Sequence, residues 1–206
     1  MDLPRPCNDD HDPVLHERDK PIRSFIAVDI PNPVKSAIGN TLSPLRESMR
    51  EVKWVELDNL HLTLKFLGNA ELPQIGLLKE KLFNALRDER KFSIRFSRIG
   101  VFPELKDPKI IWLGIDRGEA CLRNLAMKIE EVSFQSGFQK ETRPFSAHLT
   151  LGRVRDGKNI QQKKRIFEAI VFSLDGPIEL DRLTIFRSIL TPKGPHYETL
   201  FTLNLI

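Results

Sequence analysis

Cysteine and long apolar runs are scarce in this chain of 206 residues, and each scarcity excludes a class of protein. Its two cysteines, Cys7 and Cys121, cannot build a disulfide framework and stand in no metal-ligand spacing. The longest apolar run, residues 110–115, is far shorter than the roughly 18 residues of a transmembrane helix. The N-terminus is acidic and contains proline, unlike a secretory signal. We therefore expect a cytoplasmic protein without membrane contact.

The charge is distributed unevenly along the chain. Residues 1–20 carry three basic and six acidic side chains, net −3, and the whole chain carries +4, so residues 21–206 carry +7. A basic body suits a polyanionic partner such as nucleic acid, and a basic surface kept for solubility is the equal alternative. Residues 1–20 also lack helical or strand periodicity, so we expect a disordered tail before one bilobal domain at 21–206.

Beyond the tail, the hydrophobic pattern predicts about eight strands and four helices. Asn32 should cap the first helix, Pro33 should open it and Pro44 should kink or split it. Later helices are expected at residues 72–86, from 122 to an end at Gly137, and at 161–172. Strands are expected at 24–29, 60–67, 92–96, 110–115 and 148–154, and a terminal hairpin pairs 178–190 with 197–205.

A tetrapeptide repeat is the most informative feature of the sequence. His-Leu-Thr-Leu at residues 61–64 recurs unchanged at residues 148–151. Both copies lie in predicted strands and each is followed by a predicted helix, which indicates two related, pseudo-twofold lobes.

Strand geometry gives this repeat a chemical meaning, because alternate residues share a face. The leucines should anchor each strand in its core, while His61 and Thr63, and likewise His148 and Thr150, point together into a cleft. With a reference pKa near 6.5, one imidazole can serve as base and the other as acid in a phosphoryl transfer. The threonine hydroxyls would bind nonbridging phosphate oxygens.

At these residues the chain resembles the 2H phosphoesterase superfamily, which is named after two HxTx motifs. Residues 23–31 look like its opening strand, 59–68 and 145–153 like its two motifs, and 194–200 like its terminal hairpin. The resemblance covers residues 22–206 and points to the RNA 2′,3′-cyclic phosphodiesterases, also called 2′-5′ RNA ligases. Ala147 stands where that family usually has proline.

The resemblance implies an α+β fold of two lobes, each an antiparallel sheet backed by two helices, with the HxTx strands lining a central cleft. It implies hydrolysis of a terminal ribose 2′,3′-cyclic phosphate to a 2′-phosphate, with a capacity for the reverse 2′-5′ ligation. His148 would be the base and His61 the acid. No cofactor or metal is expected, the partners would be RNA ends or nucleotides carrying the cyclic phosphate, and we expect a monomer.

Three further residues are candidates for binding. Arg153 matches a family arginine and could neutralise phosphate charge. As the fifth residue after His148 it would face away from that ring in a regular strand, and a bulge would redirect it. Tyr197 and Phe25 could stack on a nucleotide or belong to the core.

Two alternatives remain open from the residues. A metal hydrolase could use both histidines as ligands, although HxTx supplies no third ligand. A noncatalytic RNA-binding protein would suit the basic body but would not need two matched imidazoles.

Overall fold

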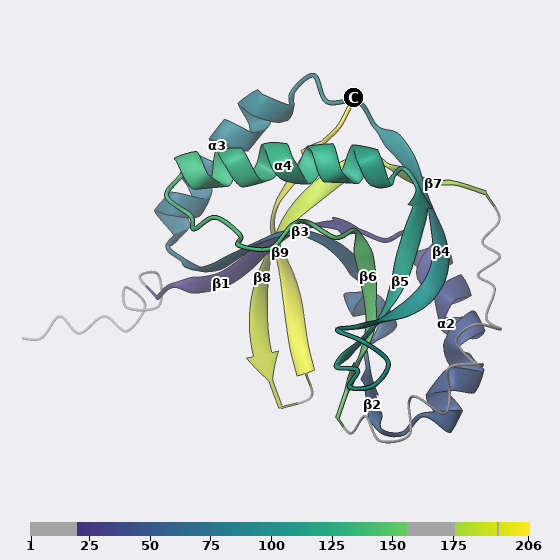
Figure 1. The fold of residues 1–206 in the computed structure, drawn as a ribbon. Helices are drawn as coiled ribbons and strands as arrows, with labels where there is room; N and C mark the ends of the chain where they lie inside the picture. The colour runs from purple at the N-terminus through teal and green to yellow at the C-terminus, as the bar shows by residue number, and fades with distance from the viewer. Residues whose placement is uncertain (1–19, 156–175, 193) are drawn as a thin grey trace, which may run out of the picture.

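Two antiparallel sheets organise the computed structural model, which describes residues 20–155, 176–192 and 194–206 (Figure 1). The expected α+β class is confirmed. One sheet has four strands in the order β3-β1-β8-β9, which are His61–Ala70, Ile22–Asp29, Arg182–Thr191 and Gly194–Asn204. The other has five in the order β2-β6-β5-β4-β7, which are Val52–Trp54, His148–Val154, Ile110–Arg117, Phe92–Phe102 and Ile178–Leu180.

Each sheet contains strands from both halves of the chain. The four-stranded sheet pairs β1 with β8, and the five-stranded sheet pairs β2 with β6. The two HxTx motifs therefore lie in different sheets, the first in β3 and the second in β6, and these two strands contact each other. Contact between β3 and β6 brings the repeat together although 87 residues separate its copies.

The described helices are α2 (Asn32–Ser48), α3 (Leu72–Leu86) and α4 (Glu119–Gln135), and a short 3₁₀ turn, η1 (Leu57–Asn59), precedes β3. Figure 1 shows α3 and α4 together above the four-stranded sheet, and α4 contacts both α3 and β3. The last residue of α4 is Gln135 and its C-cap is Ser136, and the predicted glycine, Gly137, follows with a φ of 86°. The N–H groups of Gly137 and Phe138 donate to earlier carbonyl oxygens and close the helix. The expected tail at 1–20, except Lys20, and the expected helix at 161–172 lie outside the described residues.

The predicted N-cap of the first helix is wrong, and so is a split of the helix at Pro44. The N-cap is Pro31 and not Asn32, and no side chain caps the helix. The helix also continues past Pro44 without a break. Pro44 is exposed, and the buried side chains of Leu42 and Leu45 hold the turn on either side of it against the core.

The predicted terminal hairpin is also too long at its start. Residues 178–180 form a separate strand, β7, that pairs with β4 in the five-stranded sheet, whereas β8 and β9 pair in the other sheet. Asp181 lies at the crossing, and its carbonyl oxygen accepts a 2.7 Å hydrogen bond from the Leu205 N–H. A continuous β pattern therefore spans two different sheets.

A β-bulge follows the threonine of each HxTx motif. The unpaired residue is the second leucine in both copies, Leu64 in β3 and Leu151 in β6. Because an extra residue inverts the alternation of faces beyond it, the fifth residue after each histidine returns to the histidine's face. These residues are Phe66 and Arg153, so the bulge redirects Arg153 as its predicted role requires.

Gly152 follows the second bulge, and a Cβ there would lie 2.6 Å from Val52 Cγ1 and 3.2 Å from the Trp54 ring. We expect Gly152→Ala to lower the free energy of unfolding by about 1–3 kcal/mol, because the core is overfilled. Gly76→Ala is the matched control, since a Cβ at Gly76 in α3 meets nothing within 4 Å. The control should raise stability by about 0.5–1 kcal/mol. Urea unfolding measures both, and equal stabilities of Gly152→Ala and wild type would contradict the close packing.

Candidate active site

The two motif strands present the same pair of side chains. Leu62 and Leu149 are buried in the core, while His61, Thr63, His148 and Thr150 are half-buried on the other face. This is the alternation that strand geometry predicts. Each strand therefore offers one imidazole and one hydroxyl from a rigid element.

Both histidines are oriented by a carbonyl two residues earlier. His61 Nδ1 lies 2.7 Å from Asn59 O, and His148 Nδ1 lies 2.7 Å from Ser146 O. Because a carbonyl oxygen only accepts, Nδ1 carries a proton in both rings. Nε2 is therefore the nitrogen that gains or loses a proton at each histidine.

An aromatic ring meets each imidazole edge to face. Tyr197 lies 5.1 Å from His61 at 90°, and Phe102 lies 5.2 Å from His148 at 83°. Phe25, which is 4% exposed, packs 4.8 Å from His61 and 5.0 Å from Tyr197. Phe25 thus supports these two rings from the side of the core and does not offer an open stacking face.

Burial is the largest influence on both histidines, and it lowers the pKa of each below its ordinary value. The carbonyl bonds to Nδ1 oppose this shift in both rings. The pKa of His61 is also raised by the Asp29 carboxylate and lowered by the Lys35 ammonium, which form an ion pair at 2.9 Å. At neutral pH both imidazoles are therefore more neutral than a free histidine.

A cavity of about 410 Å³ joins the two sheets beside His61. It contains His61 from β3, Arg153 from β6 and Tyr197 from β9. The burial of the Tyr197 hydroxyl raises its pKa, and the charges of Arg153 and Arg23 lower it. The full lining is Arg23, Ser24, Phe25, His61, Phe66, Gly68, Asn69, Arg153, Ser188 and Tyr197.

The structure brings together only part of the predicted set in this cavity. His61, Arg153, Phe25 and Tyr197 line it, whereas His148, Thr63 and Thr150 are not among its lining residues.

Phe66 is a cavity residue that the sequence reasoning missed. Its ring is 59% exposed and lines the cavity. It stands five residues after His61, as Arg153 stands five residues after His148. Aligning the two halves beyond their tetrapeptides would therefore have revealed it.

Two kinds of feature are absent from the part of the chain that the structure describes. No group of three or more His, Cys, Asp or Glu side chains is placed there to share a metal ion. No described helix is long and apolar enough to cross a membrane.

The LigT-like phosphoesterase family matches this chain over residues 28–112 and 115–197, one stretch for each HxTx motif. The chain belongs to this family. The predicted superfamily is therefore confirmed, and this LigT-like phosphoesterase is an enzyme of the phosphodiesterase class.

Curated relatives and solved structures support the assignment. The RNA 2′,3′-cyclic phosphodiesterase of Archaeoglobus fulgidus is 33% identical over 180 residues, covering 87% of this chain and 98% of the relative. That of Bacillus subtilis is 31% identical over 185 residues, covering 88% and 95%. A Thermus thermophilus structure has a TM-score of 0.74 at 25% identity, covering 89% of this chain and 98% of that chain. Apo E. coli LigT shares the fold, with a TM-score of 0.73 at 24% identity over 90% and 98% of the two chains.

We expect the pKa values of His61 and His148 to fall below about 6.5 in the folded protein, because burial disfavours the imidazolium ion. NMR titration of the ring Cε1–H signals, assigned with one alanine variant for each histidine, measures both values. In concentrated urea both should return to about 6.5. Since the neutral rings are favoured in the fold, their contribution to stability is lost as the pH falls from about 6.5 towards the lowered values. A folded-state pKa above 6.5 for either ring would contradict the burial argument.

Proposed function

We propose that this LigT-like phosphoesterase hydrolyses a terminal ribose 2′,3′-cyclic phosphate, on RNA or a nucleotide, to a 2′-phosphate by two-histidine acid-base catalysis. The observation that carries the proposal is the duplicated HxTx strand, in which both histidines are held through Nδ1 by a carbonyl at 2.7 Å. The substrate is supported by relatives named RNA 2′,3′-cyclic phosphodiesterase that cover most of the chain at about 30% identity.

The reaction needs one proton acceptor and one proton donor. His148 Nε2 accepts a proton from water as the water oxygen attacks phosphorus, and His61 Nε2 gives a proton to O3′ as the P–O3′ bond breaks. The product is a 2′-phosphate with a free 3′-hydroxyl, and the two histidines then exchange protons with solvent. This assignment of acid and base is the one that the resemblance to the family implies. Burial and the Lys35 ammonium lower the pKa of His61, while the Asn59 carbonyl and the Asp29 carboxylate oppose them.

The phosphate charge needs donors that are already in place. Thr63 and Thr150 stand on the histidine face of each strand and donate their hydroxyls to nonbridging oxygens. The Arg153 guanidinium lies in the cavity with His61 and adds a positive charge, which strengthens its hydrogen bonds to phosphate.

The rest of the cavity accommodates the nucleoside. Phe66 offers an exposed ring and Tyr197 a second aromatic edge, and both suit stacking against a base. E. coli LigT, which has the same fold, was crystallised in complex with 3′-AMP. With an RNA 5′-hydroxyl in place of water, the same step would join two ends by a 2′-5′ linkage.

The test of function is the turnover of a 2′,3′-cyclic nucleotide with identification of the product. His61→Ala and His148→Ala should each lower kcat by at least about 10²-fold, since each removes one proton transfer. His196→Ala is the matched control, because His196 is exposed on β9. Binding of substrate without turnover by wild type would favour a noncatalytic RNA-binding protein. Near-normal activity of either catalytic variant would remove the acid-base model.

The pH profile separates proton transfer from metal catalysis. We expect kcat/KM to follow a bell with its maximum below about pH 6.5, because both free-enzyme pKa values are lowered. Excess chelator should leave the bell unchanged, whereas a metal hydrolase would lose activity and regain it with added metal. Stopped assays at about pH 4–9, the range in which histidines titrate, with and without chelator, distinguish proton transfer from metal catalysis. Loss of turnover with chelator and its recovery with added metal would contradict the two-histidine mechanism.

A further inference from the structure

Lys65 is a buried cation that the proposed reaction does not use. It lies in β3 two residues after Thr63 and is 2% exposed. The bulge at Leu64 turns it away from the cleft and into the space between β3 and α4. Because a buried ammonium group is costly unless it is paired, its partners identify what it stabilises.

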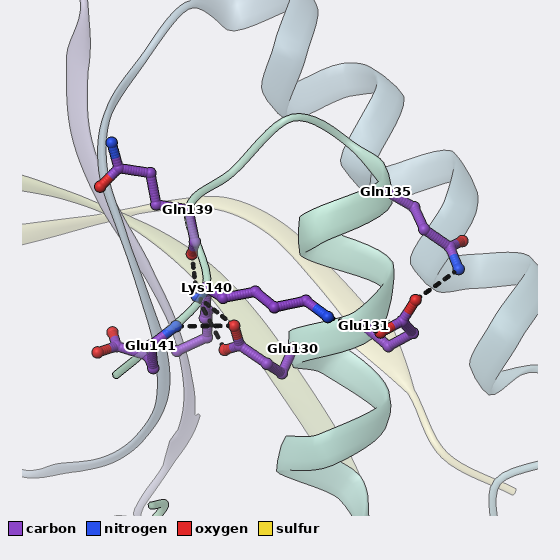
Figure 2. A network of polar contacts seen from close by, with 7 residues as sticks. Glu130, Glu131, Gln135, Gln139, Lys140 and Glu141 are labelled. Atoms are coloured by element: carbon purple, nitrogen blue, oxygen red, sulfur yellow. Dashed lines mark hydrogen bonds and ion pairs between the residues drawn. The ribbon is translucent and has the colours of Figure 1, made fainter. Parts of the chain in front are cut away.

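The partners of Lys65 lie on α4 and on the segment that follows it. Lys65 Nζ is 2.8 Å from Glu130 Oε2 and donates to Glu130 Oε1 at 3.0 Å. It also donates to the Gln139 carbonyl oxygen at 2.7 Å. The Glu141 N–H donates to Glu130 Oε1 at 2.9 Å, so the ion pair holds two backbone groups of one segment. Figure 2 shows the Glu141 N–H bonded to the Glu130 carboxylate, with the Gln139 carbonyl oxygen, which accepts from Lys65, close to the same group.

This segment is the entry to the second motif strand. Five residues after Glu141 comes Ser146, whose carbonyl oxygen accepts the Nδ1 bond of His148. Two side chains of α3 also bond to the chain near here, but only at the end of α4. Lys81 Nζ donates to Gln135 O, and Gln74 Nε2 donates to Ser136 O. Among the described residues, the side-chain hydrogen bond from β3 to the chain after Gly137 is the one that Lys65 Nζ donates to Gln139 O.

We propose that Lys65, through its ion pair with Glu130, is a positioning residue that holds the Ser146 carbonyl on His148 and thereby aligns the second histidine with the first motif strand. The proposal rests on the proposed function for its effect on turnover. Its structural part, the hold on His148, stands apart from any substrate.

Lys65→Met keeps an unbranched side chain of similar length and removes the ammonium group. The Gln139 carbonyl loses its donor and the Glu130 carboxylate loses its cation, so the segment before His148 is held less firmly. Misplacement of a catalytic group by about 1 Å can cost 10²-fold in rate. We expect kcat to fall by about tenfold to a hundredfold, with KM changed less than about twofold, because sheet pairing holds the three cavity residues Phe66, Arg153 and Tyr197.

A second readout is independent of turnover. The Ser146 carbonyl raises the pKa of His148 against the effect of burial. No charged side chain of the described residues acts on that pKa, and the ring that faces His148 is the uncharged Phe102. In Lys65→Met, the His148 pKa measured by NMR should therefore fall further, while that of His61 stays at its wild-type value.

The experiment compares wild type with Lys65→Met, Glu130→Gln and the control Lys81→Met. Glu130→Gln keeps an oxygen for the Glu141 N–H but removes the negative charge, so it should lower kcat by a smaller factor. Lys81→Met loses a lysine-to-carbonyl bond of the same length at the end of α4 and should keep wild-type kcat and His148 titration. Thermal unfolding of each variant accompanies the kinetics.

The outcomes separate the proposal from the proposed function. A lowered kcat together with a lowered His148 pKa, in Lys65→Met and not in Lys81→Met, supports positioning. A lower Tm with unchanged kcat and unchanged His148 titration overturns it. If Lys65→Met does not fold, Glu130→Gln decides by the same two readouts. If wild type turns over no cyclic phosphate, the proposed function fails, and the His148 titration still accepts or rejects the positioning role.

Discussion

The bulge at the second leucine of each HxTx motif determines which side chains share the cleft. In a regular strand the fifth residue after each histidine would face the core, and the fourth would face the cleft. The extra residue at Leu64 or Leu151 inverts that order. Arg153 and Phe66 consequently join His61 in the cavity, and Lys65 reaches Glu130 on α4. The same irregularity of backbone pairing thus accounts for two residues of the cavity and for the buried ion pair.

A second constraint is the balance between burial and hydrogen bonding at the two imidazoles. Burial lowers both pKa values, which suits a base but would deprive the acid of its proton. The carbonyls of Asn59 and Ser146 oppose this effect and also fix Nδ1 as the donor. Under the proposed function, an anionic phosphate bound between the rings would raise both pKa values again by charge attraction. The protonated acid is therefore stabilised most when substrate is present.

The sequence predicted those features that depend on local pattern. The bounds of α3 and β6 follow from hydrophobic periodicity. The glycine after α4 follows from helix-end chemistry, and the orientation of the side chains in both HxTx motifs follows from strand alternation. The features that it did not predict depend on partners distant in the chain. Residues 178–180 are separate from β8 because they pair with the edge of β4. Phe66 lines the cavity because the register of β3 against β1 shifts at the bulge of Leu64. An aromatic residue in a strand is more often part of the core than a stacking platform, and the neighbours of Phe25 place it beneath His61 and Tyr197.

The two halves keep the same His-Thr pair but differ in the residues that follow it. At the fifth position one strand carries an aromatic ring, Phe66, and the other a guanidinium, Arg153, which suit a base and a phosphate respectively. At the fourth position β3 carries Lys65, whereas β6 carries Gly152, where any side chain would collide with Val52. A lysine is useful on the first strand because a carboxylate on α4 and a free carbonyl lie within its reach. The second strand instead packs directly against β2. The repeated tetrapeptide therefore places the same imidazole and hydroxyl on both strands, and the next two residues of each copy differ. Under the proposed function, the shared pair would transfer protons and the differing residues would bind one nucleotide end.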